Sequence, residues 1–252
     1  MDKFSPFAIM AVNKRKRHRL RRLLIFILCC TSFFFFLHSD FFSLQRVEVE
    51  GNRRVPVEEI YRLTGLEVGT NLWRIDTKGV VTRLKNHPLL ETVSVKRKWP
   101  HTLVIYVHER EPLALLPGPG IFWVLDGGGY IMESISHITS KKLPLISGVQ
   151  VKGQVGPGTK LEDLRLEVAL DVLKALPPQA REEIEEIQAS DPENLLLYLP
   201  ERIKVKFGDA TSVEDKWERL QGVLKDTNQL GLLEYIDVSF NGPPVIKLRQ
   251  KR

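Results

Sequence analysis

The 252-residue sequence predicts an α+β protein with three parts: an N-terminal transmembrane helix, a β-α-α-β-β unit, and a mixed, mostly antiparallel β unit with two or more helices. Three observations predict this order. One apolar run near the N-terminus is close to the length of a membrane span. Apolar residues then alternate as in strands on either side of two segments with helical periodicity. After residue 112, short strands follow one another with tight turns.

The apolar run extends from Leu23 to Leu37 and contains no charged residue. Its fifteen residues would span only about 22 Å as a helix, which is short of a hydrocarbon core of about 30 Å. Because 23 residues from Leu20 to Phe42 reach about 34 Å, we expect the span to use both flanks, with the anchor at 23–42. A cleavable signal peptide is the rival interpretation. However, bulky residues stand at Phe33–Leu37, where cleavage requires small ones.

A basic cluster precedes the run and consists of Lys14, Arg15, Lys16, Arg17, Arg19, Arg21 and Arg22. Residues 1–22 carry eight basic residues and one acidic residue, a net charge of +7, whereas the whole chain carries +6. Basic flanks of a membrane span remain in the cytoplasm. We therefore interpret the cluster as a topology signal of a single-pass membrane protein. Its tail (1–22) is cytoplasmic, the bulk is exported, and the positive charge requires no nucleic acid partner.

The residues that could carry chemistry form no catalytic or metal-binding pattern. Both cysteines, Cys29 and Cys30, lie inside the apolar run, so the exported part holds no disulfide and no thiolate metal site. The six histidines lack ligand spacing, and the acidic residues of 182–186 are typical of a solvated face. The sequence therefore predicts a protein that is not an enzyme and that uses no cofactor, no metal and no small-molecule substrate.

Local signals place the elements of the first exported unit. The first two expected elements are a strand at 46–50 and a helix from Pro56 that has Val57, Ile60, Tyr61 and Thr64 on one face and ends at Gly65. They are followed by a helix from an Asp76 cap to a stop at Pro88 and by a hairpin of strands near 93–98 and 103–107.

Four motifs in this unit resemble those of a known family. They are VEGNRRV (49–55), GTNLWRID (69–76), VKRKWPHTL (95–103) and EREP (109–112). In this order, behind one anchor with a basic flank, they are similar to the POTRA domain of the FtsQ/DivIB family of bacterial cell-division proteins. The resemblance implies a POTRA domain at 43–112, a β domain at 113–248 and a short tail at 249–252.

The second exported unit is predicted from turns and alternation. We expect a hairpin turned at Asp126–Gly129, an extended segment at 143–148, and a helix with Leu161, Leu164, Val168, Val172 and Leu176 inward that ends at Pro177. A meander should follow over 184–189, 195–199 and 203–207. The last elements are a helix that buries Trp217, Leu220 and Leu224, and a hairpin turned at Asn241–Gly242.

The last hairpin is the candidate binding site. A terminal strand presents a sheet edge, which can pair with a strand of another chain, and we expect only Asp237 and Lys247 as charges in its strands. Coverage of this strand by its own domain remains the structural alternative. The resemblance implies that FtsB, in complex with FtsL, binds here partly by strand addition. It places the contact at Tyr235, Phe240, Val245, Ile246 and Leu248, although Pro243 and Pro244 remove two donor N–H groups beside the strand.

The implied function is a divisome scaffold at the septum, with further division proteins contacting the POTRA domain and lipid contacting the anchor. A POTRA-bearing component of envelope protein translocation or chaperoning is the alternative. An envelope hydrolase would require a catalytic constellation, which we do not find in the sequence.

Overall fold

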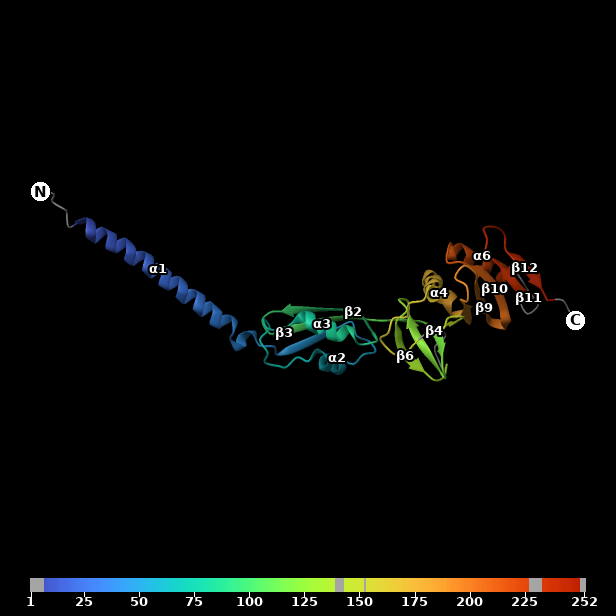
Figure 1. Ribbon diagram of the computed structural model, residues 1–252, viewed down its shortest axis with the longest axis horizontal. Coiled ribbons are helices and arrows are strands. Elements are labelled where there is room, and N and C mark those ends of the chain that lie inside the picture. Colours follow the sequence, from blue (N-terminus) through green and yellow to red (C-terminus); the bar gives the residue numbers. More distant parts are fainter. Residues whose placement is uncertain (1–6, 139–142, 152, 227–232, 250–252) are drawn as a thin grey trace. The chain divides into compact units, whose positions relative to one another are not determined.

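The computed structural model describes residues 7–138, 143–151, 153–226 and 233–249, with side chains from residue 18 onward. The chain forms two compact units, shown in Figure 1. The first comprises Met1–Leu84 and Val93–Val107, and the second comprises Lys85–Thr92 and His108–Arg252.

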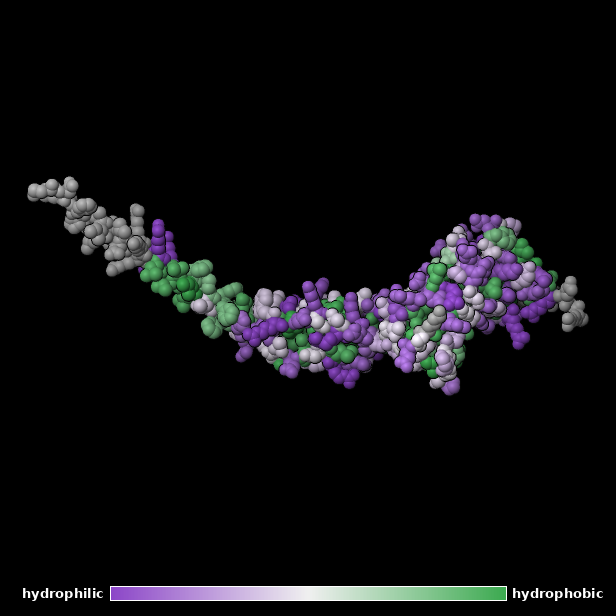
Figure 2. All heavy atoms as spheres, viewed as in Figure 1, coloured by the Kyte–Doolittle hydropathy of each residue, from purple (hydrophilic) through white to green (hydrophobic). Residues whose placement is uncertain are grey.

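Helix α1 (Phe7–Leu37) opens the first unit, and Figure 2 shows the hydrophobic band along it. Its segment His18–Leu37 has 20 residues with a mean hydropathy of 2.0, which corresponds to about 30 Å of helix. The predicted length assumed one continuous helix from Leu20 to Phe42, but helix α1 is shorter at its C-terminal end. It ends at Leu37, and a separate 3₁₀ turn, η1 (Asp40–Phe42), follows.

The first unit has the predicted β-α-α-β-β order. Its elements are β1 (Arg46–Glu50), α2 (Val57–Thr64), α3 (Thr77–Lys85), β2 (Leu90–Lys98) and β3 (Thr102–Glu109). The sheet order is β1-β3-β2, with β1 parallel to β3 and at one edge. Since β1 and β3 are separated by both helices and β2, this pairing closes the unit.

Two predicted signals set the helix boundaries in this unit. Gly65 ends α2 in the left-handed region at φ 61°, which glycine adopts without steric cost. The Asp76 carboxylate accepts hydrogen bonds from the backbone N–H groups of Lys78 and Gly79 at 3.1 and 3.0 Å, and thereby caps α3. Of the residues predicted on one face of α2, Ile60 and Thr64 are buried, whereas Val57 at the start of the helix is exposed.

The second unit contains a nine-stranded sheet in the order β12-β11-β10-β9-β8-β7-β4-β5-β6. Its strands are β4 (Pro112–Gly118), β5 (Ile121–Asp126), β6 (Ile131–Ile135), β7 (Leu145–Ser147), β8 (Glu186–Gln188), β9 (Leu195–Leu199), β10 (Ile203–Gly208), β11 (Leu233–Asp237) and β12 (Val245–Leu248). Most neighbours are antiparallel, as predicted, whereas β4–β7, β7–β8 and β10–β11 are parallel. Each parallel pair requires a crossover, and helices supply two of the three.

The helices of this unit are α4 (Leu164–Ala175), α5 (Pro178–Glu182) and α6 (Val213–Asp226), with a short turn η2 (Pro200–Arg202). They pack with one face of the sheet into a single core that includes Leu173, Val205 and Leu220. The predicted stripe of α4 is partly wrong. Leu164 is 65% exposed, because the buried face begins two residues later at Leu166.

The opposite face of the sheet is also buried near β4 and β5. Leu115, Val124 and Met132 form a second small cluster there. Strand β4 is therefore covered on both faces, and its run Leu113–Leu116 is buried throughout. A strand of this kind does not alternate, which explains why alternation did not predict it.

Candidate binding surfaces

The charged groups buried in the second unit serve the fold. Arg110, from the EREP motif, pairs with Asp126, and its guanidinium lies 3.8 Å from the centroid of the Tyr130 ring. The other carboxylate oxygen of Asp126 accepts hydrogen bonds from the N–H groups of Gly128 and Tyr130, and so closes the predicted turn. Across the described residues, no group of three or more His, Cys, Asp or Glu side chains is placed to hold a metal ion.

A second buried cation stabilises the start of α6. The Lys216 side chain is 2% exposed and donates to the carboxylate and the carbonyl oxygen of Asp209 at 2.7 and 3.0 Å. Hydrogen bonds from Lys216 and Thr211 lower the pKa of Asp209 to about 2. This pair fixes the loop between β10 and α6.

The terminal hairpin presents an open edge. Strand β12 is the edge strand of the nine-stranded sheet, and all four of its residues are exposed. The side chains of Phe240, Val245, Ile246 and Leu248 are 43%, 48%, 45% and 55% exposed. The sequence-predicted residues are therefore together on one hairpin at a sheet edge, and the described residues do not bury them.

The cross-strand register divides this patch between the two faces of the sheet. Ile246 lies opposite Ile236, and Leu248 lies opposite Leu233, whose side chains are both buried in the core. Residues that face each other across an antiparallel pair point to the same side of the sheet. Ile246 and Leu248 thus extend the hydrophobic layer of the core past its last covered strand. An added strand or helix would bury them.

The other face of the hairpin is more polar than predicted. Tyr235 is half-buried, with Lys206 at 4.3 Å and Lys247 at 5.7 Å from its ring centroid. Strand β11 begins at Leu233, so Glu234 also belongs to it and forms a 2.9 Å ion pair with Lys247. The hydrogen bond to Glu234 raises the pKa of Lys247. The expectation that only Asp237 and Lys247 carry charge in these strands is therefore wrong.

Arg219 of α6 holds the turn of the hairpin. Its Nη1 donates to the carbonyl oxygens of Phe240 and Gly242 at 2.8 and 2.6 Å, and its Nη2 donates to that of Val238 at 3.3 Å. The role of this residue was not predicted from the sequence. Its spacing of about twenty residues from the turn gives no local signal, since the contact depends on how α6 packs.

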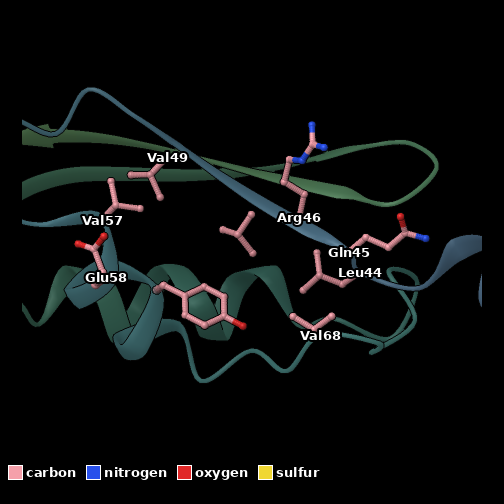
Figure 3. Close-up of a pocket in the computed structure, with 9 residues that line it drawn as sticks. Leu44, Gln45, Arg46, Val49, Val57, Glu58 and Val68 are labelled. Carbon is pink, nitrogen blue, oxygen red and sulfur yellow. The ribbon is translucent and has the colours of Figure 1, made fainter.

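The first unit has an open groove beside its own edge strand. The groove has a volume of about 400 Å³ and is lined mainly by β1 and α2, with Val49 and Val57 pointing into it and Glu58 at its rim (Figure 3). Val68 lines the end near Leu44 (Figure 3). Strand β1 has a neighbour only on the β3 side within this three-stranded sheet. The exposure of Val57 noted above is explained by its place in this groove.

The predicted topology signal lies within α1. Arg19, Arg21 and Arg22 are exposed on the helix, whereas the side chains of Lys14, Arg15, Lys16 and Arg17 lie outside the described residues.

Together these features define a class of protein. A POTRA-like unit and a β unit with an open terminal edge follow one helix that is long and apolar enough to cross a membrane. Residues 42–110 match the family model described as POTRA domain, FtsQ-type, and residues 114–239 match that of the FtsQ/DivIB C-terminal region. The chain belongs to the FtsQ/DivIB family of cell division proteins.

Named relatives agree with this assignment. A cell division protein FtsQ of Geobacter sp. is 34% identical over 81% of this chain and 75% of its own length. The FtsQ of Syntrophotalea carbinolica is 29% identical over 83% and 75%, and a DivIB of Clostridium acetobutylicum is 25% identical over 83% and 84%. The chain is therefore similar to proteins that carry both names.

Proposed function

We propose that this protein is a non-enzymatic, bitopic scaffold of the bacterial divisome that binds FtsB and FtsL through its terminal hairpin. The observation that carries the proposal is the exposed edge strand β12, with Ile246 and Leu248 extending the core layer beyond its cover. Strand addition at such an edge supplies main-chain hydrogen bonds, and the two apolar side chains supply burial. Family membership supports a role in division.

The domain organisation that goes with this function has five segments. They are a cytoplasmic tail (1–22), an anchor (23–42), a POTRA domain (43–112), a β domain (113–248) and a short tail (249–252). The basic cluster from Lys14 to Arg22 keeps the N-terminus in the cytoplasm. The POTRA domain and the β domain then lie outside the inner membrane, at the septum, where other division proteins contact the POTRA domain.

Substitution of the hairpin tests the binding site. The double variant Phe240→Ala with Leu248→Asp removes one exposed aromatic ring and places a charge on the core-side face of β12. We expect it to abolish co-purification with FtsB and FtsL while the protein remains folded and in the membrane fraction. Leu164→Asp is the matched control, because Leu164 is an exposed leucine of α4 in the same unit. Retained binding in the double variant would contradict the proposed site.

The alternative function, in envelope protein translocation or chaperoning, has its own candidate surface in the apolar groove beside β1. Depletion of the protein in cells separates the two functions. Filaments with unfinished septa are expected for a divisome scaffold, whereas a loss of outer-membrane proteins would favour translocation.

A further inference from the structure

Within the first unit, an aromatic cluster lies where α1 meets the POTRA domain. It consists of Phe36, Phe41, Phe42, Trp73 and Trp99. The ring centroids of Trp73 and Trp99 are 4.3 Å apart, and Phe42 lies 5.8 Å from Trp99 and 5.3 Å from Phe36. Although these rings touch, Phe41, Trp73 and Trp99 remain 57%, 53% and 43% exposed. Large aromatic side chains that cluster on an exposed surface indicate that a membrane or another molecule covers them.

Hydrogen bonds fix the position of the cluster at the C-terminal end of α1. The Asn71 side chain donates a 2.9 Å hydrogen bond to the carbonyl oxygen of Leu37, the last residue of α1, and accepts one of 3.0 Å from the N–H of Trp73. Arg97 of β2 donates to the carbonyl oxygens of Leu72 and Ile75 at 2.8 and 2.6 Å. These bonds hold the GTNLWRID segment so that the Trp73 ring is presented next to the helix end.

The position of the cluster identifies what covers it. If His18–Leu37 crosses the hydrocarbon core, its 20 residues account for about 30 Å, so Leu37 lies at the boundary of that core. The headgroup layer beyond it is roughly 5–7 Å thick on each side of the membrane. Through Asn71, Trp73 is bonded to that boundary residue. Tryptophan concentrates in this layer because its ring is apolar and its indole N–H is polar.

We propose that Phe41, Trp73 and Trp99 insert into the headgroup–acyl boundary of the phospholipid bilayer that α1 crosses. The POTRA domain then lies on the membrane surface. Continuity with the spanning helix favours lipid over a protein partner, because Phe36 of α1 already packs on Phe41 and Phe42 within the same cluster. The proposal rests on α1 as a membrane span and does not depend on FtsB or FtsL.

Tryptophan quenching by lipid tests this proposal with the full chain. The protein has four tryptophans, and the other two, Trp123 and Trp217, are 9% and 6% exposed in the second unit. In vesicles of phosphatidylcholine brominated near the acyl–headgroup end, we expect a loss of emission of at most about half, from the two interfacial rings. The variant Trp73→Phe with Trp99→Phe should lose this quenching. The control Trp123→Phe with Trp217→Phe should keep it.

Two outcomes would overturn the proposal. One is that the control variant is quenched by aqueous acrylamide but not by brominated lipid, which would place the rings in water or under a protein partner. The other is release of the chain from vesicles by alkaline carbonate, which would remove the membrane span itself. Both differ from a failure of FtsB binding, because purified protein and lipid alone are present.

Discussion

The guanidinium of Arg219 in α6 donates a 2.8 Å hydrogen bond to the carbonyl oxygen of Phe240, the exposed aromatic residue of the terminal hairpin. With its bonds to Gly242 and Val238, one side chain holds three backbone carbonyls of the segment that joins β11 to β12. The shape of the proposed binding edge is therefore set by a helix that packs into the core behind it.

Replacement of this arginine should weaken binding while the unit stays folded. An ammonium group cannot reproduce the planar fork that reaches three carbonyls, so Arg219→Lys should loosen the hairpin. We expect roughly tenfold weaker binding of FtsB and FtsL, equivalent to about 1.4 kcal/mol, in a pull-down titration. Arg181→Lys is the control, since Arg181 of α5 donates to the carbonyl oxygens of Leu176 and Lys174 at the C-terminal end of α4. Unchanged affinity in Arg219→Lys would contradict the prediction, because the hairpin would then keep its conformation without the hydrogen bonds of Arg219.

The buried pair of Arg110 and Asp126 should be strongly coupled. Their side chains are 11% and 7% exposed, and loss of one partner leaves the other charge in the interior. Arg110→Met should lower the free energy of unfolding by roughly 3–5 kcal/mol, measured by urea denaturation of the full chain in detergent micelles. The double variant Arg110→Met with Asp126→Asn should lose less than the sum of the single variants. Strict additivity would contradict the coupling.

Acid should remove the contribution of the Asp209–Lys216 pair. The pKa of Asp209 is lowered from its ordinary value of 3.8 to about 2 in the folded protein. A lowered folded pKa contributes stability above pH 4 that is lost as the pH falls toward 2. The Asp209 side chain is 46% exposed, so screening reduces the effect. Asp209→Asn should therefore lower the free energy of unfolding at pH 7 by roughly 1–2 kcal/mol.

The same variant should approach the parent protein in stability near pH 2, because the parent then loses its carboxylate as well. Asp171→Asn is the control, since Asp171 forms an exposed ion pair with Lys174 on α4. A surface pair of this kind contributes little. A stability difference that stays constant between pH 7 and pH 2 would refute the assignment to this carboxylate.

Gly51, directly after β1, should tolerate no side chain. Its φ is 91°, and an added Cβ would collide with the carbonyl oxygen of Val107 in β3. Gly51→Ala should therefore destabilise the first unit by roughly 2 kcal/mol or more, seen as a lower urea midpoint. Gly69→Ala separates strain from collision, because Gly69 has φ 92° and open space around it. Equal losses in both variants would mean that backbone strain alone accounts for the effect.

Local signals predicted much of the fold. The Asp76 cap, the left-handed Gly65 and the turn at Asp126 were visible because each depends on a few neighbouring residues. Strand β4 was missed because it is buried on both faces and does not alternate. Helix α5 was missed because Pro177 was interpreted as a stop, although it also precedes a helix that begins at Pro178.

The binding edge was predicted in part. The alternation of Ile236 and Val238 and the Asn241–Gly242 turn indicated the hairpin. The parallel pairing of β11 with β10 and the role of Arg219 depend on contacts formed only when α6 packs. The ion pair of Glu234 with Lys247 depends on the cross-strand register of β11 and β12. The aromatic cluster likewise joins residues far apart in the sequence, such as Phe42 and Trp99, so no local pattern predicted it.

The order of the sheet has a consequence for biogenesis. Strand β12 pairs with β11, and β11 joins β10 only across α6, so the edge at β12 depends on elements earlier in the chain. If the chain is exported with the topology proposed above, these residues leave the translocation channel after β4 to β10 have emerged. The proposed binding edge is then completed last, and a chain with an unfinished or misfolded β unit would lack the edge through which we propose that it recruits its partners.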